Sequence, residues 1–463
     1  MADLFNGLSI ARSGIRAQTN ILNVTGHNIA NANTPGFSRQ TVTLTPIAGL
    51  DGDNILGAGE LRIGGGVDVK QASRTRYALY DEIYRRENQS LTYYSKMENL
   101  VQQVEMLYDE PSDRGLGTLL DNFYNSWYDI ANDPGSSAAR QQLHNNADEL
   151  TGRVNRYYTS LVDIYEAIDN EIANIPDKIN QLSTEIARLN TSIEVTEVNG
   201  ISSNDLRDQR DSAIDQLTEY SNIRVAEKDS GAVTIFFGDR VVVDGAATEM
   251  LSSKSLSEED RSFRRHSIIS KDGTEYVPKQ GELGALIDFR DNVLMGLLDD
   301  LDTLAETLVT TVNAEHRNGV GLDGLTGRNF FDPESTNAFN IKLSDDISNV
   351  ANIAASADGS IGDNTNALTI ADLKDSKVID NYYTITEFYN GIISKLGILS
   401  QEAAAGRKNS EMLVNQIENT RQSFQGVNID EELVLMIQTQ RLYQSASRLI
   451  SVIDRMLETL IAM

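Results

Sequence analysis

The feature that most constrains this chain is an apolar heptad pattern at each of its two ends. Near the N-terminus, apolar or small residues recur at spacings of three and four over positions 4–29, and the same spacing runs over positions 436–460. This spacing is typical of a helix that packs along a second helix as a coiled coil. We expect these seam positions to form the assembly face: Leu4, Leu8, Ile15, Leu22, Ile29, Met436, Tyr443, Ile450, Ile453, Leu457 and Leu460.

The C-terminal stripe is wider than one partner helix can cover. Five further apolar residues extend it: Leu433, Ile437, Leu449, Val452 and Met456. Asn428 and Glu431 have the spacing of a capping box, which predicts where this helix begins. In a monomer both end stripes would be exposed. We therefore expect the two terminal helices to pair and their outer face to contact identical copies, as in rings and helical filaments.

Between the ends, periodicity and the seven prolines predict a mostly helical chain with inserted strands. The turn at Asn33, Pro35, Gly36 and Phe37 ends the first helix, and we include these four residues in the assembly face. Strand-like alternation predicts an extended arm at 41–45 and 62–69, and short strands within 223–277. The predicted helices cover 77–110, 119–130, 136–220, 283–318 and 367–425, with a kink or a new helix at Pro176.

The expected fold is mainly α with inserted β, in which a long helical bundle or coiled-coil body carries paired terminal helices and a smaller β-rich outer domain. Residues 1–76 and 426–463 would form a terminal coiled-coil domain with the extended arm. Residues 77–222, 283–320 and 365–425 would form a rod-like helical domain. Residues 223–282 and 321–364 would form the β-rich outer region.

The net charge of −28 argues against nucleic acid and anionic lipid as partners. The N-terminal 45 residues are mildly basic, with Arg12, Arg16 and Arg39 against Asp3. A solvated surface is the simpler interpretation of the acidic residues. A contact between the acidic body of one copy and the basic end of another is the alternative. No apolar run approaches the ~20 residues that span a bilayer, so we expect no membrane insertion. The N-terminus lacks the pattern of a cleaved signal peptide.

No catalytic, cofactor or metal site emerges, and we expect a protein that is not an enzyme. Cysteine is absent, which removes thiolate ligands and nucleophiles. The four histidines are far apart in the sequence, and His27 is best interpreted as a polar interface residue. The run at 51–54 resembles the start of a calcium loop, but its twelfth position is Arg62 in place of glutamate. Gly64–Gly66 lacks the lysine of a phosphate loop.

Several segments resemble the bacterial flagellar axial proteins, the family of rod, hook and junction subunits. NIANANTPGFSRQ at 28–40 resembles the N-terminal signature of that family, and GVNIDEEL at 426–433 with QTQRLYQSA at 438–446 resembles its C-terminal signature. The long helical body resembles the junction members in particular, as do NDLRDQRD at 204–211 and GDNTNAL at 362–368.

The resemblance implies a structural subunit of the hook–filament junction that is extracellular and reaches the flagellum without a cleaved signal peptide. Its implied partners are copies of itself in a ring, the hook protein, the second hook–filament junction protein, and an export chaperone on the C-terminal helix. No cofactor is implied. Before assembly the ends would be disordered or covered by the chaperone.

Three alternatives remain. A rod or hook subunit of the same family would have a body dominated by strands. A wall-cleaving enzyme with axial ends would need a compact catalytic domain with a carboxylate in a cleft. An intracellular coiled-coil scaffold would not need the turn at 33–36.

Overall fold

The computed structural model describes residues 2–48, 64–108, 110, 112, 115–198, 200, 202–238, 240–257 and 263–462, and the side chains from residue 5 onward. The calcium-like run at 51–54 lies outside these residues. Contacts divide the chain into two compact units. Unit 1 contains Met1–Asn88, Lys178–Met250 and Glu411–Met463, and unit 2 contains Gln89–Asp177 and Leu251–Ser410. The three-domain division expected above stays a prediction.

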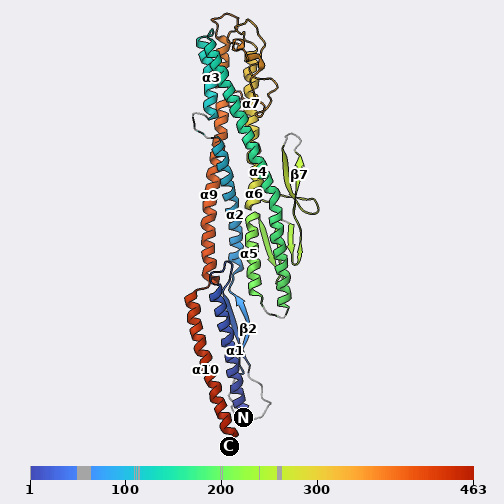
Figure 1. Cartoon of the computed structure of the whole chain (residues 1–463), viewed down its shortest axis with the longest axis vertical. Coiled ribbons are helices and arrows are strands. Elements are labelled where there is room, and N and C mark those ends of the chain that lie inside the picture. Colours follow the sequence, from blue (N-terminus) through green and yellow to red (C-terminus); the bar gives the residue numbers. More distant parts are fainter. Residues whose placement is uncertain are drawn as a thin grey trace. The chain divides into compact units, whose positions relative to one another are not determined.

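In unit 1 the two terminal helices lie side by side and antiparallel. These are α1 (Ala2–Asn31) and α10 (Ile429–Ile461), and Figure 1 shows both chain ends at the same end of the pair. Asn428 caps α10 by accepting the backbone N–H groups of Asp430 and Glu431 at 3.0 and 3.4 Å. The predicted pairing of the ends is therefore confirmed.

A two-stranded antiparallel ribbon packs along α1. It consists of β1 (Gln40–Ile47) and β2 (Gly66–Arg74). Gly66 has φ +111°, and a Cβ there would lie 2.2 Å from the Ser13 Oγ of α1, so only glycine fits this close approach. The same Ser13 Oγ accepts the Val67 N–H at 3.1 Å.

The rest of unit 1 combines helices with a small sheet. It includes the start of α2 (Ala78–Tyr108), the end of α4 (Ser137–Glu197), all of α5 (Asn204–Tyr220) and the end of α9 (Ile385–Gln425). The antiparallel sheet has the order β3 (Ile223–Glu227), β4 (Val233–Phe237), β5 (Arg240–Asp244), β6 (Ala247–Thr248). Asn190 of α4 ties the sheet to the helices, because its side chain bonds the Val233 N–H, the Val233 carbonyl and the Gly245 carbonyl at 2.9–3.0 Å.

Unit 2 is built around long helices and an aromatic core. It contains α3 (Leu116–Asn132), α6 (Gly281–Asp288), a π-helical turn (Phe289–Leu294), α7 (Met295–His316) and α8 (Thr365–Ala371), together with parts of α2, α4 and α9. A three-stranded sheet of β7 (Ser252–Ser257), β8 (Arg264–Ile269) and β9 (Glu275–Tyr276) belongs to the same unit. Three short 3-10 turns complete it, at Asp345–Ile347, Val350–Asn352 and Asp372–Asp375. Trp127, Phe123 and Phe330 pack in its core without solvent exposure.

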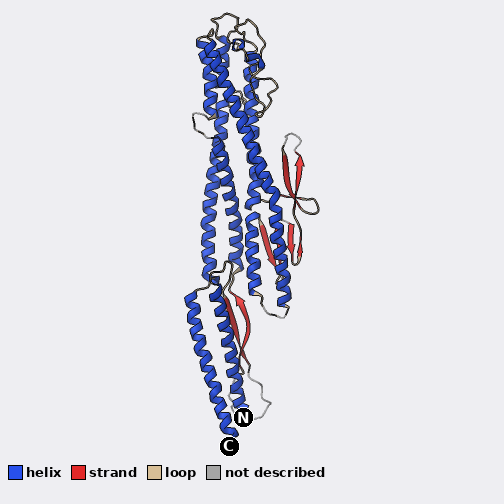
Figure 2. Ribbon diagram, in the orientation of Figure 1, coloured by secondary structure: helices blue, strands red, loops and turns tan. Residues whose placement is uncertain are grey.

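The expected fold class is confirmed: Figure 2 shows mostly helix with small sheets. Some boundaries were wrong. The region 136–220 is two helices, because a turn separates α4 from α5. The α4 helix continues through Pro176 as a single helix, so no new helix begins there. Residues 376–384 were expected to be helical but are not. Ile379 and Tyr383 form a β-bridge there around Asp380 and Asn381, which both have positive φ.

Candidate assembly site

The α1–α10 pair buries only part of the predicted seam. Ile453 is buried, while Leu8, Ile15, Leu22, Ile29, Met436, Ile450 and Leu457 are half-buried. Tyr443 and Leu460 are 39% and 49% exposed, and the side chain of Leu4 lies outside the description. Small residues bring the helices close: Ala11 and Ala17 are buried, and a Cβ at Gly7 would lie 3.5 Å from the Ile453 Cδ1.

A broad apolar face remains exposed on α10. These side chains are between 40% and 55% exposed: Leu433, Val434, Ile437, Leu442, Leu449, Val452, Met456 and Leu460. Burying a large aliphatic side chain contributes about 1.5–3 kcal/mol, so this face would stabilise a contact strongly once it is covered. The widened stripe predicted from the sequence is thus exposed in the monomer, and its role in assembly stays a prediction.

The turn after α1 is exposed on its tip and anchored at its end. Asn33, Pro35 and Gly36 are exposed, and Gly36 has φ +77°, which glycine adopts readily. Phe37 is half-buried and meets the His27 ring edge-on at 5.4 Å. The His27 Nε2 also lies 3.2 Å from an Asp205 carboxylate oxygen, which fits a polar interface residue.

A buried carboxylate joins the two terminal helices to this turn. Glu432 of α10 is 1% exposed, and its carboxylate accepts from Asn28 Nδ2 of α1 at 3.2 Å and from Arg39 Nε at 2.7 Å. Asn28 also exchanges two hydrogen bonds with the Gln40 backbone at 2.9 and 3.0 Å. The Arg39 backbone in turn donates to the Gln425 carbonyl at the end of α9. The last turn of α1, the first turn of α10 and the end of α9 are therefore fixed at one point.

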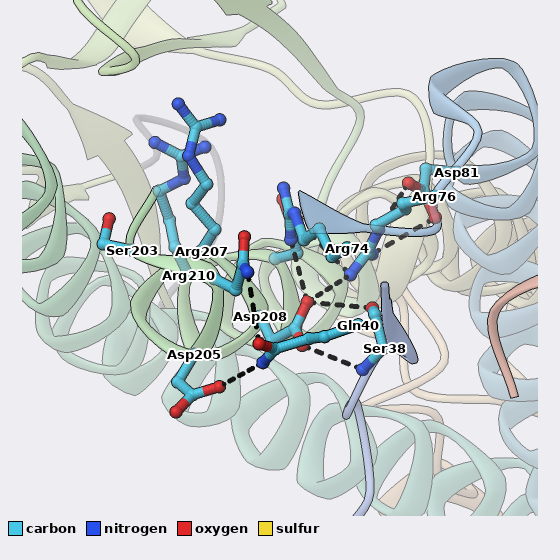
Figure 3. A network of polar contacts seen from close by, with 12 residues as sticks. Ser38, Gln40, Arg74, Arg76, Asp81, Ser203, Asp205, Arg207, Asp208 and Arg210 are labelled. Carbon is cyan, nitrogen blue, oxygen red and sulfur yellow. Dashed lines mark hydrogen bonds and ion pairs between the residues drawn. The ribbon is translucent and has the colours of Figure 1, made fainter. Parts of the chain in front are cut away.

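Next to this point lies a cluster of arginines and aspartates, shown in part in Figure 3. Asp208 of α5 accepts from the Ser38 backbone and hydroxyl at 2.8 Å and from Arg74 at 2.9 Å. Asp211, one turn on, lies 2.6 Å from Arg74 and 3.3 Å from Arg76. The ribbon and the turn are thus bound to one face of α5.

The cluster continues onto α2 and α9. Arg85 of α2 reaches Asp215 at 2.6 Å. Arg421 of α9 lies 3.0 Å from both Asp81 and Asp215 and places its guanidinium over the Tyr84 ring. We call the set Arg74, Arg76, Asp81, Arg85, Asp208, Asp211, Asp215 and Arg421 the collar cluster.

The collar cluster is held by opposite charges at close range. Burial alone would raise the pKa of the Asp211 carboxyl, but Arg76, Arg74 and Arg85 outweigh burial and hold that pKa well below its usual range. Burial likewise opposes the charge of Arg76, yet Asp211 and Asp81 raise its pKa above the usual value. Such a network is costly to break on one side only, because the remaining charges stay buried without a partner.

Three of the segments quoted for the family resemblance meet here. Asn28, Ser38 and Gln40 come from 28–40, Asp205 and Asp208 from 204–211, and Glu432 from 426–433. Gln40 Nε2 donates to Asp205 at 2.7 Å, as Figure 3 shows. Of the two other segments, 438–446 lies on α10, and 362–368 lies in unit 2, where Asn364 and Asn366 bond the carbonyls of Ala131 and Ala354.

Sequence reasoning missed the collar cluster. Its aspartates on α5 recur at positions 208, 211 and 215, which is one helical face, but a chain with 68 acidic residues has many such faces. The signal that separates them is the run of arginines at 74, 76 and 85, which follows the arm directly.

The contacts described above anchor segments of unit 1 to one another. No group of three or more histidine, aspartate or glutamate side chains in the described ranges is placed to hold a metal ion. Among the described helices, none combines the length and the apolar character needed to cross a membrane.

Comparison with known proteins connects these elements to flagellar proteins. The family model "Flagellar hook-associated protein FlgK helical domain" matches residues 101–331. The models "Flagella basal body rod protein" and "Flagellar basal body rod FlgEFG protein C-terminal" match residues 8–37 and 418–463. The rod models therefore match α1 and α10, and the helical-domain model matches the region between them.

Full-length relatives agree. Flagellar hook-associated protein 1 of Bacillus subtilis strain 168 is 30% identical over 504 aligned positions, covering 100% of this chain and 98% of the relative. The protein of the same name from Escherichia coli K12 is 24% identical over the full length of both chains. The solved flagellar hook junction protein FlgK from Burkholderia pseudomallei has the same fold, with a TM-score of 0.65 and 16% identity over 74% of this chain and 100% of that one. This chain belongs to the flagellar hook-associated protein 1 family.

Proposed function

We propose that this chain is a structural subunit of the bacterial flagellum that forms the hook–filament junction and assembles through its paired terminal helices. The observation that carries the mechanism is the α1–α10 pair, which buries Ile453 yet leaves ten large apolar side chains of α10 at least 40% exposed. Copies that pack side by side through this face would bury it and stabilise a ring.

The collar cluster gives this assembly its rigidity. We infer that a junction subunit must hold its terminal pair in a fixed orientation, so that the pair does not rotate freely against the structure that follows it. Buried charge contacts from β2, α2, α5 and α9 fix the point at which both ends of the chain join the rest of unit 1. The role is mechanical, and we propose that the protein is not an enzyme.

The proposed partners follow from this position. They are neighbouring copies, the hook protein on one side and the second junction protein on the other. An export chaperone would cover the apolar face of α10 before assembly, because an exposed stripe of this width promotes premature association. The chain would act outside the cell after export without signal-peptide cleavage.

Deletion in the source bacterium tests the function. Cells without the protein should keep their hooks and release filament subunits into the medium, and a plasmid copy should restore filaments. Loss of the hooks themselves would contradict the junction role and favour a rod or hook subunit, the alternative that shares both terminal segments.

Restoration by variants tests the mechanism. Ile437→Asp should fail to restore filaments although its monomer is folded, because Ile437 is 52% exposed on the face that copies would cover. Full restoration by this variant would argue against the α10 face as the assembly surface.

A further inference from the structure

The apolar face of α10 also carries a row of arginines. Arg441, Arg448 and Arg455 are seven residues apart, so they lie on one face at intervals of about 10.5 Å along the helix. All three are exposed, on the side of α10 away from the buried Thr439 and Ile453. Figure 1 shows the α1–α10 pair of unit 1, in which α1 lies along only one side of α10.

The middle of the terminal pair is cationic in a strongly acidic protein. Residues 4–29 contain Arg12 and Arg16 and no carboxylate, and residues 433–453 contain Arg441 and Arg448 and no carboxylate. These two stretches carry a charge of +4. Because the whole chain has a net charge of −28, its other residues carry −32. Within the part of the chain that the structure describes, none of these four arginines makes an ion pair, and neither does Arg455. Arg455 donates only to the Ser451 carbonyl there.

Covering this face therefore raises an electrostatic problem. Ile437 and Val452 lie among the arginines, so a helix that buries these side chains also removes water from the guanidinium groups. An unpaired buried charge is strongly unfavourable, which would offset much of the apolar gain. Two terminal pairs at the same level cannot solve this for Arg441 and Arg448, because neither pair has a carboxylate between residues 433 and 453 to place at their height.

The carboxylates that can solve it lie at the two ends of α10. Asp430 and Glu431 are exposed in the first turn, and Asp454 and Glu458 are exposed near the last. A copy displaced along the helix axis brings one of these ends beside the arginine row of its neighbour. We propose that the arginine row of α10 pairs with the terminal carboxylates of α10 in a second, axially displaced copy of this chain. This inference rests on the proposed function and adds the contact that sets the stagger between copies.

Cross-linking tests the contact directly. Arg448→Lys keeps the charge and supplies an amine, which a carbodiimide joins to a carboxylate in direct contact. Within one α10 the Asp454 carboxylate is six residues from position 448, about 9 Å along the axis, and Glu458 is ten residues away, about 15 Å. The purified monomer, treated in the same way, shows whether any cross-link forms within one chain. In isolated hook–filament structures we expect a cross-link from position 448 to an α10 peptide that contains Asp430 and Glu431 or Asp454 and Glu458. A cross-link to another protein, or no cross-link, would overturn the proposal.

Charge removal tests whether the contact matters. The triple variant Arg441→Gln, Arg448→Gln, Arg455→Gln should enter junctions at least tenfold less than the wild type. The matched variant Gln438→Ala, Gln440→Ala, Gln444→Ala alters three exposed residues of the same helix and should change incorporation less than twofold. Equal or greater incorporation of the arginine variant would mean that the row only keeps copies apart, and it would refute the proposal.

The two proposals fail in different ways. If the wild-type chain does not restore filaments in the deletion strain, the junction function is wrong. If the wild type restores filaments and the arginine variant restores them equally well, only the charge contact is wrong.

Discussion

Replacing Glu432 with glutamine should loosen both ends of the chain at once. Its carboxylate is 1% exposed and accepts from Arg39 at 2.7 Å and from Asn28 at 3.2 Å. An amide in its place removes the nearer of the two counter-charges of Arg39. It also turns its NH₂ group, itself a donor, toward either Arg39 or Asn28. Breaking one side of a buried charge contact costs about 3 kcal/mol, which corresponds to roughly a 150-fold change in an equilibrium constant.

Glu431 supplies a matched control one residue away. Its side chain is 62% exposed and lies 3.8 Å from Arg39, so Glu431→Gln should cost less than about 1 kcal/mol. Native-state hydrogen exchange measures both variants, because it reports the opening free energy of each segment. We expect the protection of α1 and α10 amides to fall by roughly two orders of magnitude in Glu432→Gln, and that of unit 2 to stay unchanged. Equal effects of the two variants would refute the role of the buried carboxylate.

Three further predictions follow from the same contacts. Asp211→Asn leaves Arg74, Arg76 and Arg85 without their shared carboxylate and should lower the unfolding free energy by about 3–5 kcal/mol in urea titrations, whereas the surface variant Glu185→Gln should cost under about 0.5 kcal/mol. Burial lowers the pKa of His316 from 6.5 to about 4, and the neutral ring accepts the Ala354 N–H. The stability that the neutral ring contributes is therefore fully present above pH 6.5, and the free energy of unfolding should fall by about 3 kcal/mol as the pH drops to 4. His316→Gln should flatten this pH dependence. Ile453→Asp places a charge between α1 and α10 and should lower the helical signal of the purified monomer, while Ile437→Asp should leave it intact.

The paired ends could be predicted from the sequence because heptad spacing reports directly on helix packing. The positions of Ile453 and Thr439 in the seam follow from a period of 3.5 residues, and their burial against α1 follows from pairing alone. The exposed stripe could also be predicted, since Ile437 and Val452 fall outside that seam. The β1–β2 ribbon was visible as alternation. Within the described residues its second strand begins at Gly66, and positions 62 and 63 of the predicted strand lie outside them.

The collar cluster could not be predicted because ion pairs leave no periodic trace. Arg421 and Asp81 are 340 positions apart in the sequence, and nothing local marks them as neighbours. The capping box at Asn428 was half right for a related reason. Asn428 caps the helix, but the Glu431 side chain lies near Arg39, a contact that depends on the folded turn at 33–37. The break at 376–384 contains two consecutive residues with positive φ, Asp380 and Asn381. Aspartate and asparagine adopt this conformation more readily than most residues, but they also occur in helices, so the sequence alone does not predict the break.

The central claim is that α1 and α10 are already paired in the monomer, and not disordered as the family resemblance implies, and that the outward face of α10 is solvent-exposed there and covered in the junction. Because the chain contains no cysteine, a single introduced cysteine reports the exposure of one position without background. Ile437→Cys should react rapidly with a maleimide in the purified monomer and at least tenfold more slowly in isolated hook–filament structures, whereas Ile453→Cys should react slowly in both. Equal reactivity of Ile437→Cys in the monomer and in the assembled junction would contradict the account.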